Sequence, residues 1–312
     1  MRIVIIGAYD PVDKERFRMA AESAEIRFGA DLSAVEADLI KADAVIGSVP
    51  GEMLARLPRL RWMHSPAAGV DRDLTPQLRE SEIVLTSSAG NGGIPLAEHA
   101  MMLMLMLNRS APRWFEAQRN RTWDRFVHGE LNGQTVGIVG LGNAGADLAL
   151  KAKAFHMRVL GLRRRTGMTT PNVDQLFGPD ELMEFLPECD HVVITTPRTA
   201  ATANLFDHAA FAAMKSTAYI ICISRGGIID DDALLDALRQ GTIAGAGLDA
   251  HDVEPLPADS PFWGLPQVIV TPHNGATTAG TARRGREIVA ENLRRFVRDQ
   301  PLLNVVDKAA GY

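Results

Sequence analysis

The sequence is poor in cysteine and in aromatic residues, and it contains no long hydrophobic run. Its 312 residues include only two cysteines, Cys189 and Cys222, which lie in or beside apolar runs, so buried reduced thiols are expected rather than a disulfide. The most apolar run, residues 100–107, is far too short to span a bilayer. The chain opens directly on a predicted strand, without a signal peptide. These features predict a cytoplasmic protein.

Neither sign of charge dominates the chain. It carries 33 Lys and Arg against 38 Asp and Glu, and its net charge of −5 is spread along the sequence. This balance argues against a nucleic-acid partner or a membrane surface. With 46% hydrophobic and 23% charged residues, the chain has the composition of a globular protein. Its length is sufficient for two domains with separate cores.

The most informative stretch is residues 135–166, with the sequence TVGIVGLGNAGADLALKAKAFHMRVLGLRRRT. Its apolar run 136–139 predicts a buried parallel strand, and the run 157–162 predicts a second one. Between them, a helix is predicted from the spacing of Leu148, Leu150, Ala152 and Phe155. The order of strand, helix and strand is that of a βαβ unit.

A glycine-rich turn, G-x-G-x-x-G, joins the first strand of this unit to its helix. Gly140 permits a tight turn, Gly142 lets the backbone approach a pyrophosphate, and Gly145 lets helix and strand pack closely. The backbone N–H groups that open the helix, at Asn143 and Ala144, favour a phosphate. The turn therefore predicts a dinucleotide site, and a strand–helix turn without a ligand is the alternative.

Short apolar runs alternate with helical patterns along the rest of the chain. Before residue 95 they predict a small, flavodoxin-like parallel α/β domain, with strands at 3–6, 44–46, 62–64 and 83–86 and helices near 13–22, 33–40 and 51–56. After the βαβ unit they predict a doubly wound parallel sheet of the Rossmann type, with strands at 191–195, 218–223, 244–248 and 268–271 and helices near 179–186, 207–214 and 231–240.

Two domains follow from this alternation. Residues 1–95 together with 285–312 are predicted to form a substrate-binding domain, to which the last helical pattern returns, and residues 96–284 a dinucleotide-binding domain. The helix that opens at Pro95 is apolar on every side, which predicts burial all round, between the domains or in the interface of a homodimer. Its four methionines are interpreted as core filler, and no metal site is expected.

Three polar residues follow predicted strands of the second domain. Arg225 comes after the apolar run 218–223, and His273 comes after 268–271. Glu254 lies a few residues beyond 244–248. An arginine can hold a carboxylate, and a histidine can transfer a proton near neutral pH when a carboxylate orients it. Each residue taken singly also has a structural interpretation. Arg225 could form a surface ion pair, Glu254 could be a loop residue, and His273 could be a turn histidine.

The motifs around these residues resemble those of the D-isomer-specific 2-hydroxyacid dehydrogenase family over nearly the whole chain. The matching stretches are SPAAGVD, LNGQTVGIVGLGNAG, ISRGGIIDDDALLDAL, GAGLDAHDVEPLP and TPHNGATT. The resemblance implies a reaction in which a reduced nicotinamide passes hydride to a 2-oxo acid. It makes His273 the proton donor, Glu254 the carboxylate that keeps this histidine charged and oriented, and Arg225 the group that binds the substrate carboxylate.

The resemblance also implies the surroundings of the reacting groups. Backbone N–H groups of Ala68 and Gly69 would contact the substrate carboxylate. The nicotinamide cofactor would lie beside Thr196, Pro197, Ile223, Ser224, Asp249, His273 and Gly275. Glu98 and His99 match a helix position of the family to which no catalytic role is assigned.

The end of the second strand departs from the pattern of NAD-specific members, which place an aspartate there. This chain has Arg163, Arg164 and Arg165 instead, followed by Thr166. A guanidinium suits the 2′-phosphate of NADP, so NADP is predicted as the cofactor and NAD as a less efficient one. A solvated basic turn that accepts both cofactors is the alternative.

Glyoxylate and hydroxypyruvate are the leading predicted substrates. Other members of the family act on a phosphorylated hydroxy acid or on phosphite, and some use NAD. No extra basic cluster in SPAAGVD favours a phosphorylated substrate. The family also includes dinucleotide-sensing corepressors, which is the alternative from outside the enzymes.

Overall fold

The computed structural model describes residues 1–164, 167 and 169–312. The chain divides into two compact units, the first formed by Met1–Asn91 with Thr278–Tyr312 and the second by Gly92–Thr277. Both divisions fall a few residues before those predicted from the sequence, because each lies just before a long helix, and these helices begin at Gly93 and Ala279. The roles of the two units in substrate and dinucleotide binding stay predictions.

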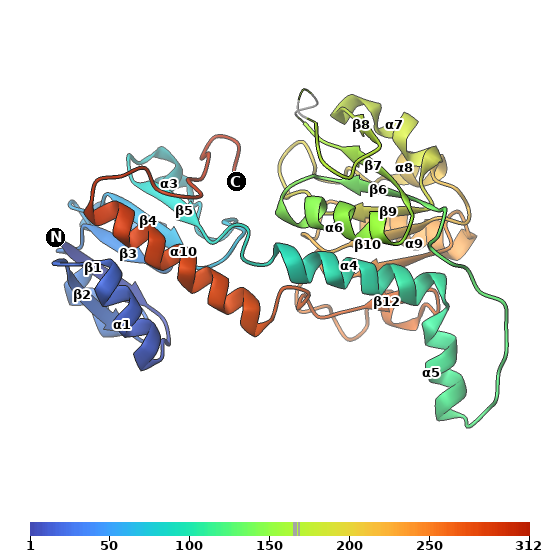
Figure 1. Ribbon diagram of the computed structural model, residues 1–312, viewed down its shortest axis with the longest axis horizontal. Helices are drawn as coiled ribbons and strands as arrows, with labels where there is room; N and C mark the ends of the chain where they lie inside the picture. The colour runs from blue at the N-terminus through green and yellow to red at the C-terminus, as the bar shows by residue number, and fades with distance from the viewer. Residues whose placement is uncertain (165–166, 168) are drawn as a thin grey trace. The chain divides into compact units, whose positions relative to one another are not determined.

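The first unit is built on a five-stranded parallel sheet (Figure 1). In the sheet order β2-β1-β3-β4-β5, its strands are Glu25–Gly29, Arg2–Ile6, Ala44–Ile46, Trp62–Ser65 and Val84–Ser87. This is the flavodoxin order. The sequence patterns missed β2 because it is an edge strand in which exposed and half-buried residues alternate, without a continuous apolar run.

Helices cover both faces of this sheet. The helices of the first unit are α1 (Pro11–Ala20), α2 (Glu36–Leu39), α3 (Pro76–Glu80) and α10 (Ala279–Val297). On one face, Phe17 of α1 and Leu293 of α10 share a core with Ile3 and Ile5 of the inner strand β1. On the other face, Val4 packs with residues of α2, α3 and the neighbouring strands. The last helix of the chain thus packs on its first strand and helix.

The second unit is built on a seven-stranded parallel sheet (Figure 1). In the order β12-β11-β10-β9-β6-β7-β8, its strands are Val268–Val270, Gly245–Leu248, Tyr219–Cys222, His191–Ile194, Thr135–Val139, Arg158–Leu162 and Gln175–Phe177. The strand order reverses between β6 and β9, which is the Rossmann topology. The predicted fold class is confirmed, although β8 was not foreseen.

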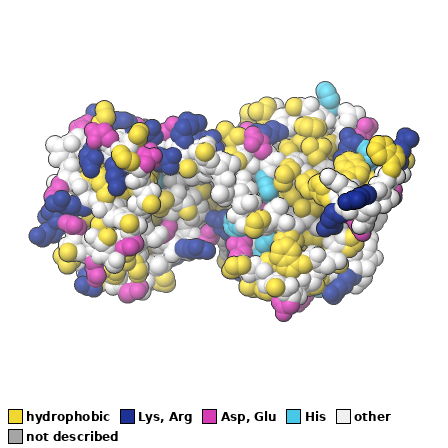
Figure 2. Space-filling view, turned by 90° about the horizontal axis from the view of Figure 1, so that it is seen from below, with side chains coloured by type: hydrophobic (Ala, Val, Ile, Leu, Met, Phe, Trp, Pro, Cys, Tyr) yellow, Lys and Arg dark blue, Asp and Glu magenta, His cyan; other side chains and the backbone are white. Residues whose placement is uncertain are grey.

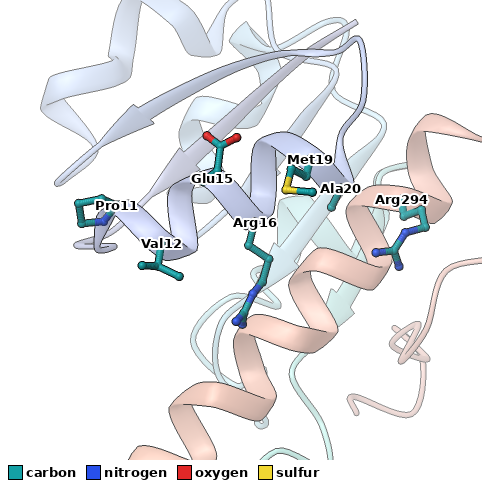
Figure 3. Close-up of a pocket in the computed structure, with 7 residues that line it drawn as sticks. All are labelled: Pro11, Val12, Glu15, Arg16, Met19, Ala20 and Arg294. Carbon is teal, nitrogen blue, oxygen red and sulfur yellow. The ribbon is translucent and has the colours of Figure 1, made fainter.

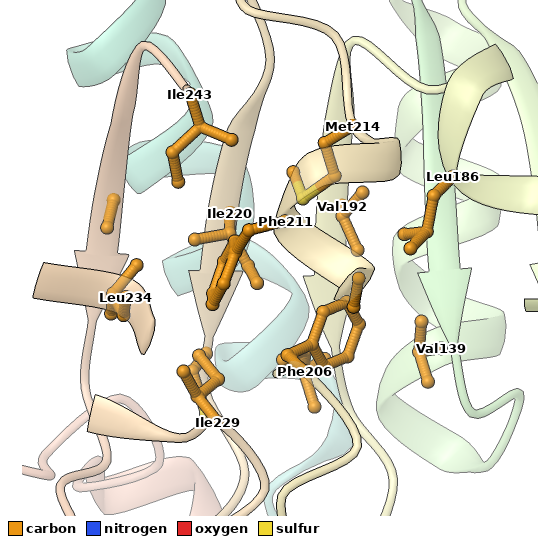
Figure 4. Packing of buried hydrophobic residues seen from close by; sticks show 14 of the residues in the cluster. Val139, Leu186, Val192, Phe206, Phe211, Met214, Ile220, Ile229, Leu234 and Ile243 are labelled. Carbon is orange, nitrogen blue, oxygen red and sulfur yellow. The ribbon is translucent and has the colours of Figure 1, made fainter. Parts of the chain in front are cut away.

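Two layers of helices cover this sheet. The helices of the second unit are α4 (Gly93–Asn108), α5 (Ala111–Arg119), α6 (Asn143–Ala154), α7 (Leu182–Phe185), α8 (His208–Ala213) and α9 (Asp231–Gln240). Phe206, Phe211 and Met214 pack against Ile220 on one face (Figure 4). Helices α4 and α6 pack on the other. The sequence patterns missed α3 and α5, which are short.

The long apolar helix is not buried on every side within the chain by itself, and its burial in a homodimer interface stays a prediction. One face of α4 packs on α6, β10 and β11, but Ile94 and Met102 on its outer face are exposed. In α6, Leu148 and Ala152 are buried as the periodicity predicts, whereas Leu150 and the following Phe155 are exposed. Within the described part of the chain, no helix combines the length and the hydropathy needed to cross a membrane.

Both sheets bury titratable side chains. The two cysteines are free and buried, as predicted, and burial raises the pKa of Cys189 to about 12. His64 in β4 bonds through Nδ1 to Thr86 Oγ1 (2.8 Å), and burial lowers its pKa to about 4. His191 in β9 stacks on the Tyr219 ring, and burial lowers its pKa to about 4 as well. Both histidines are therefore neutral in the folded protein near pH 7.

These two histidines predict a loss of stability on mild acidification. Below pH 6.5, the ordinary pKa of histidine, these two histidines bind protons in the unfolded chain. In the folded chain they remain neutral until about pH 4. The free energy of unfolding therefore falls as the pH drops through this window, by about 1.4 kcal/mol per pH unit for each histidine. Urea unfolding between pH 6.5 and 5, where few carboxylates titrate, measures the slope.

Replacing either buried histidine should flatten this slope. His64→Gln and His191→Gln test the two units separately, and His208→Gln, at an exposed position on α8, is the matched control. A slope that neither buried substitution changes would show that the pKa values of these histidines are the same in the folded and the unfolded chain, and would contradict the prediction.

Candidate active site

The glycine-rich turn between β6 and α6 is shaped by contacts that only glycine permits. Gly140 has a φ of +99°, in the region that L side chains rarely adopt. A Cβ on Gly145 would lie 2.1 Å from the carbonyl oxygen of Gly140, so the strand and the helix touch there. A Cβ on Gly142 would meet no atom of the described residues within 4 Å, apart from its own chain neighbours. Open space in front of Gly142 is what close approach of a pyrophosphate to this backbone requires.

The N-terminus of α6 completes this turn. Gly142 is the N-cap, and no side chain of the described residues caps the helix. The N–H groups of Asn143, Ala144 and Gly145 open the helix, where the helix dipole adds partial positive charge. Thr195 Oγ1 donates to the carbonyl oxygen of Gly140 at 2.5 Å, which holds the turn against the end of β9. The turn therefore fits the pyrophosphate of a dinucleotide cofactor.

The predicted ribose end of the site follows β7. Arg163 is half-buried, its backbone N–H donates to Phe177 O (3.0 Å), and its Nη1 donates to Thr170 Oγ1 (2.9 Å). Arg164 is exposed. Arg165, the third predicted arginine, lies outside the described residues, as does Thr166. Thr170 was not foreseen, because it comes after the strand and belongs to no motif.

The remaining predicted cofactor residues lie where neighbouring strands end. Thr196 and Pro197 follow β9, and a Cβ on Gly140 would lie 2.8 Å from the Thr196 nitrogen, so this segment touches the glycine-rich turn. Ile223, which is buried, and Ser224 follow β10. In a parallel sheet, these positions share the carboxyl edge with the ends of β11 and β12.

Glu254 and His273 meet at this edge. The Nδ1 atom of His273 lies 2.9 Å from Glu254 Oε1 and 2.8 Å from Oε2. Burial acts to raise the pKa of Glu254, but hydrogen bonds from the His251 backbone N–H and from the His273 ring outweigh it and lower the pKa. The carboxylate is therefore ionised at neutral pH, so Nδ1 is the donor of this pair. The second ring nitrogen, Nε2, is left to exchange a proton with another molecule.

Arg225 lies on the neighbouring loop. It follows β10 by three residues, and its Nη1 donates to the carbonyl oxygen of Ser224 at 2.8 Å. A Cβ on the next residue, Gly226, would lie only 2.0 Å from His251 O. Glycine at this position thus lets the Arg225 loop pack directly against the loop that leads to Glu254. The backbone N–H of His251 bonds the Glu254 carboxylate, and this contribution leaves no signal in the sequence.

Asp249 follows β11 and lies beneath the His273 loop. Its side chain is buried, and it accepts hydrogen bonds from the backbone N–H groups of Asn274 and Gly275 (both 3.0 Å) and from Thr271 Oγ1 (2.7 Å). The sequence singled out Asp249 and Gly275 as cofactor neighbours, but not the contact between them. That assignment stays a prediction.

The predicted substrate loop of the first unit follows β4. Ala68 is exposed and Gly69 half-buried. The loop is anchored where it leaves the strand, because the Ser88 N–H donates to the carbonyl oxygens of Ser65 (3.1 Å) and Ala67 (3.0 Å). Contact of Ala68 and Gly69 with a substrate carboxylate stays a prediction.

A surface hollow lies elsewhere in the first unit, between α1 and α10 (Figure 3). It is lined by Pro11, Val12, Glu15, Arg16, Met19, Ala20 and Arg294. None of these is a predicted site residue, and the walls are the outer surfaces of two helices. We therefore place the candidate active site at the carboxyl edge of the second sheet, where an ionised carboxylate, a histidine and an arginine lie on adjacent loops.

Known proteins are similar to this chain in sequence and in fold. The family described as "D-isomer specific 2-hydroxyacid dehydrogenase, NAD binding domain" matches residues 101–275. A glyoxylate reductase of Pyrococcus furiosus is 33% identical over 267 residues, which cover 82% of this chain and 79% of the relative. A D-3-phosphoglycerate dehydrogenase of Methanocaldococcus jannaschii is 30% identical over 98% of this chain, which spans only 60% of that relative's length.

A solved structure matches along the whole chain. The NADPH-dependent glyoxylate/hydroxypyruvate reductase of Sinorhizobium meliloti, in complex with NADP and sulfate, is 30% identical. Its TM-score is 0.87, with 100% of both chains covered. The present chain belongs to the D-isomer-specific 2-hydroxyacid dehydrogenase family, an oxidoreductase family, and the predicted resemblance is confirmed.

Proposed function

We propose that this chain is an NADP-dependent reductase of small 2-oxo acids, with glyoxylate or hydroxypyruvate as substrate. The observation that carries the proposal is the pair formed by His273 and Glu254 at the carboxyl edge of a sheet whose glycine-rich turn fits a dinucleotide. The glyoxylate/hydroxypyruvate reductase of S. meliloti supports the choice of substrate class and cofactor.

The proton of the reaction comes from His273. A reduced nicotinamide, when bound, supplies hydride to the carbonyl carbon of the substrate. His273 then donates a proton from Nε2 to the carbonyl oxygen, while Nδ1 stays hydrogen-bonded to Glu254. The ionised Glu254 carboxylate offsets the positive charge of the donating imidazolium, and its hydrogen bond to Nδ1 fixes the plane of the ring. Because His251 N–H also bonds this carboxylate, at 3.0 Å, Glu254 itself is held in place.

Arg225 binds and polarises the substrate. Its guanidinium presents a planar fork that can take two carboxylate oxygens, or one carboxylate oxygen and the carbonyl oxygen. In the second arrangement the arginine also stabilises the negative charge that develops on the carbonyl oxygen. The loop that carries Arg225 packs against the loop that leads to Glu254, so the two groups are positioned as one assembly.

An oxidation assay at 340 nm tests the proposal. The purified chain is mixed with NADPH and with one 2-oxo acid at a time: glyoxylate, hydroxypyruvate, pyruvate or a phosphorylated 2-oxo acid. Each measurement is repeated with NADH. Turnover of glyoxylate or hydroxypyruvate is the expected result. Turnover of only the phosphorylated acid would favour the activity named for the M. jannaschii relative. NADPH binding without any turnover would favour a dinucleotide sensor.

We propose in addition that the protein is a homodimer formed by the second unit. Beside the exposed side chains on α4, the chain leaves Trp123 90% and Val127 99% exposed on the segment after α5. Figure 2 shows hydrophobic side chains gathered together with basic ones on this face of the second unit. Apolar side chains this exposed mark an interaction surface, and twofold dimers are the commonest assembly of soluble proteins.

Light scattering after size-exclusion chromatography tests the dimer. Twice the chain mass of 33.9 kDa is expected for the unaltered protein. The double variant Trp123→Glu, Val127→Glu places charges on the proposed interface and should shift the mass toward one chain. Val12→Glu, on the exposed surface of α1, is the matched control and should leave the mass unchanged. The mass of a single chain for the unaltered protein at micromolar concentration would contradict the proposal.

A further inference from the structure

We propose that His99 is a positioning residue for the reaction, acting through Thr271 and Asp249 to hold the backbone that carries His273. The inference rests on the proposed function, because it concerns the proposed proton donor. Its four participants all lie in the second unit, on α4 and on the loops after β11 and β12.

The Asp249 carboxylate is the centre of this network. Its side chain is only 1% exposed, and both of its oxygens accept hydrogen bonds. Oδ1 accepts from Thr271 Oγ1 (2.7 Å) and from the N–H of Asn274 (3.0 Å). Oδ2 accepts from the N–H of Gly275 (3.0 Å). The two backbone donors directly follow His273, so one buried carboxylate determines the conformation of the loop at the proposed proton donor.

His273 needs such support because of its backbone conformation. Its φ of +50° lies in the left-handed region that residues with a side chain rarely adopt. A conformation of this kind persists only where neighbouring contacts impose it. The N–H groups of Asn274 and Gly275, both bonded to Asp249, are the contacts on its C-terminal side.

His99 supplies the outer end of the network. Its Nε2 lies 3.0 Å from Thr271 Oγ1 and 3.5 Å from Asp249 Oδ1. The Thr271 hydroxyl has a single proton, and the short contact to the carboxylate takes it. Thr271 Oγ1 can then only accept from the histidine, so Nε2 of His99 carries a proton and is the donor. The hydrogen bonds run in one direction, from His99 through Thr271 to Asp249.

The His273 loop packs closely against Asp249 and His99. A Cβ on Gly275 would lie 2.8 Å from Asp249 Oδ2 and 3.1 Å from His99 Cδ2, so glycine there lets the loop close onto both. The neighbour of His99 on α4, Glu98, is exposed, whereas the His99 side chain is 12% exposed and faces the network. His251 Nε2 also bonds the Thr271 carbonyl oxygen, at 3.1 Å, which fixes the same residue from another side.

Two substitutions of His99 separate a donor from a space-filling side chain. In His99→Gln the amide nitrogen can replace Nε2 as donor, whereas His99→Leu fills the space without a donor. We expect His99→Leu to lower kcat by about tenfold to a hundredfold, the range in which misplacing a reacting group acts. KM and the Kd of NADPH should change little. His99→Gln should restore most of kcat, and Glu98→Gln is the matched control on the exposed face.

Amide hydrogen exchange of the segment 271–277 supplies a readout that needs no turnover. The Asn274 and Gly275 amides should exchange faster in His99→Leu than in the unaltered chain, and at the original rate in His99→Gln. Thr271→Val removes the hydroxyl between His99 and Asp249 and keeps the branched shape. It should accelerate the exchange of the same two amides, and it replaces His99→Leu in this test if that variant does not fold.

The two measurements keep this inference apart from the proposed function. If no 2-oxo acid is turned over, the exchange rates still decide whether His99 holds the loop. Unchanged exchange in both His99→Leu and Thr271→Val would overturn the inference. Equal losses of kcat in His99→Gln and His99→Leu would overturn it too, because His99 would then matter for its shape alone.

Discussion

His273→Ala is expected to reduce turnover by about 10²–10⁴-fold, the range in which removal of a general acid acts. The affinity for NADPH should stay nearly unchanged, because the glycine-rich turn and the arginines after β7 are untouched. Steady-state rates and a fluorescence titration of NADPH measure the two quantities. His208→Ala, which removes an exposed histidine of the same unit, is the control and should behave as the unaltered enzyme.

The partner of His273 should control the pH dependence. Glu254 is ionised at neutral pH because its hydrogen bonds lower its pKa, and its negative charge favours the protonated ring. Glu254→Gln keeps a hydrogen-bond acceptor but removes this charge. The ring then loses its proton at a lower pH, so the alkaline limb of the kcat profile should move to lower pH. Near-normal turnover in His273→Ala would overturn the proposed mechanism, whatever the profile of Glu254→Gln.

NADPH should be preferred over NADH by at least about a hundredfold in kcat/KM. Two charge-assisted hydrogen bonds from arginines to a 2′-phosphate contribute roughly 1.5–3 kcal/mol each, and about 1.4 kcal/mol corresponds to a factor of ten. Solvent screening favours the lower end of this range for the exposed Arg164. Arg163 is half-buried, and its Nη1 donates to Thr170 Oγ1, so its guanidinium is held at the strand end.

Side-by-side kinetics with both cofactors tests this preference. Arg163→Ala and Arg164→Ala should each raise the KM for NADPH and leave the kinetics with NADH almost unchanged. Arg239→Ala, which removes an exposed arginine from the last turn of α9, is the matched control for net charge. Equal kcat/KM with NADPH and NADH in the unaltered protein would contradict the predicted preference for NADPH. The arginines would then form a solvated basic turn.

Sequence patterns predicted the fold best where a strand is buried on both faces. The inner strands β1, β6 and β9 are mostly apolar, because helices cover both sides of each sheet. The edge strands β2 and β8 were not predicted, because exposed positions interrupt their hydrophobic pattern. The same limit explains α4, where hydrophobic residues on every side do not reveal which face a neighbour covers.

For the candidate site, the sequence by itself determined the family, the glycine-rich turn, and the choice of Arg225, Glu254 and His273 as candidates. These features are local, since each depends on a residue type at a fixed distance from a strand. The resemblance implied that Glu254 orients His273, but tertiary structure alone decided the geometry of that contact and the bond of His251 N–H to the same carboxylate. Such contacts join loops after different strands, and their geometry depends on the sheet order and the backbone, neither of which is written in any local pattern.

The network at His99 shows the same division most clearly. The residue was noticeable in the sequence because its surroundings match a family helix, but no pattern connected it with Thr271, which is far away along the chain. Only the packing of α4 against the ends of β11 and β12 brings its ring to a threonine hydroxyl and a buried carboxylate. Hydrogen bonds between distant side chains form only when the donor–acceptor distance lies within a few tenths of an ångström of its preferred value and the bond angle is favourable. Those are properties of the folded chain alone.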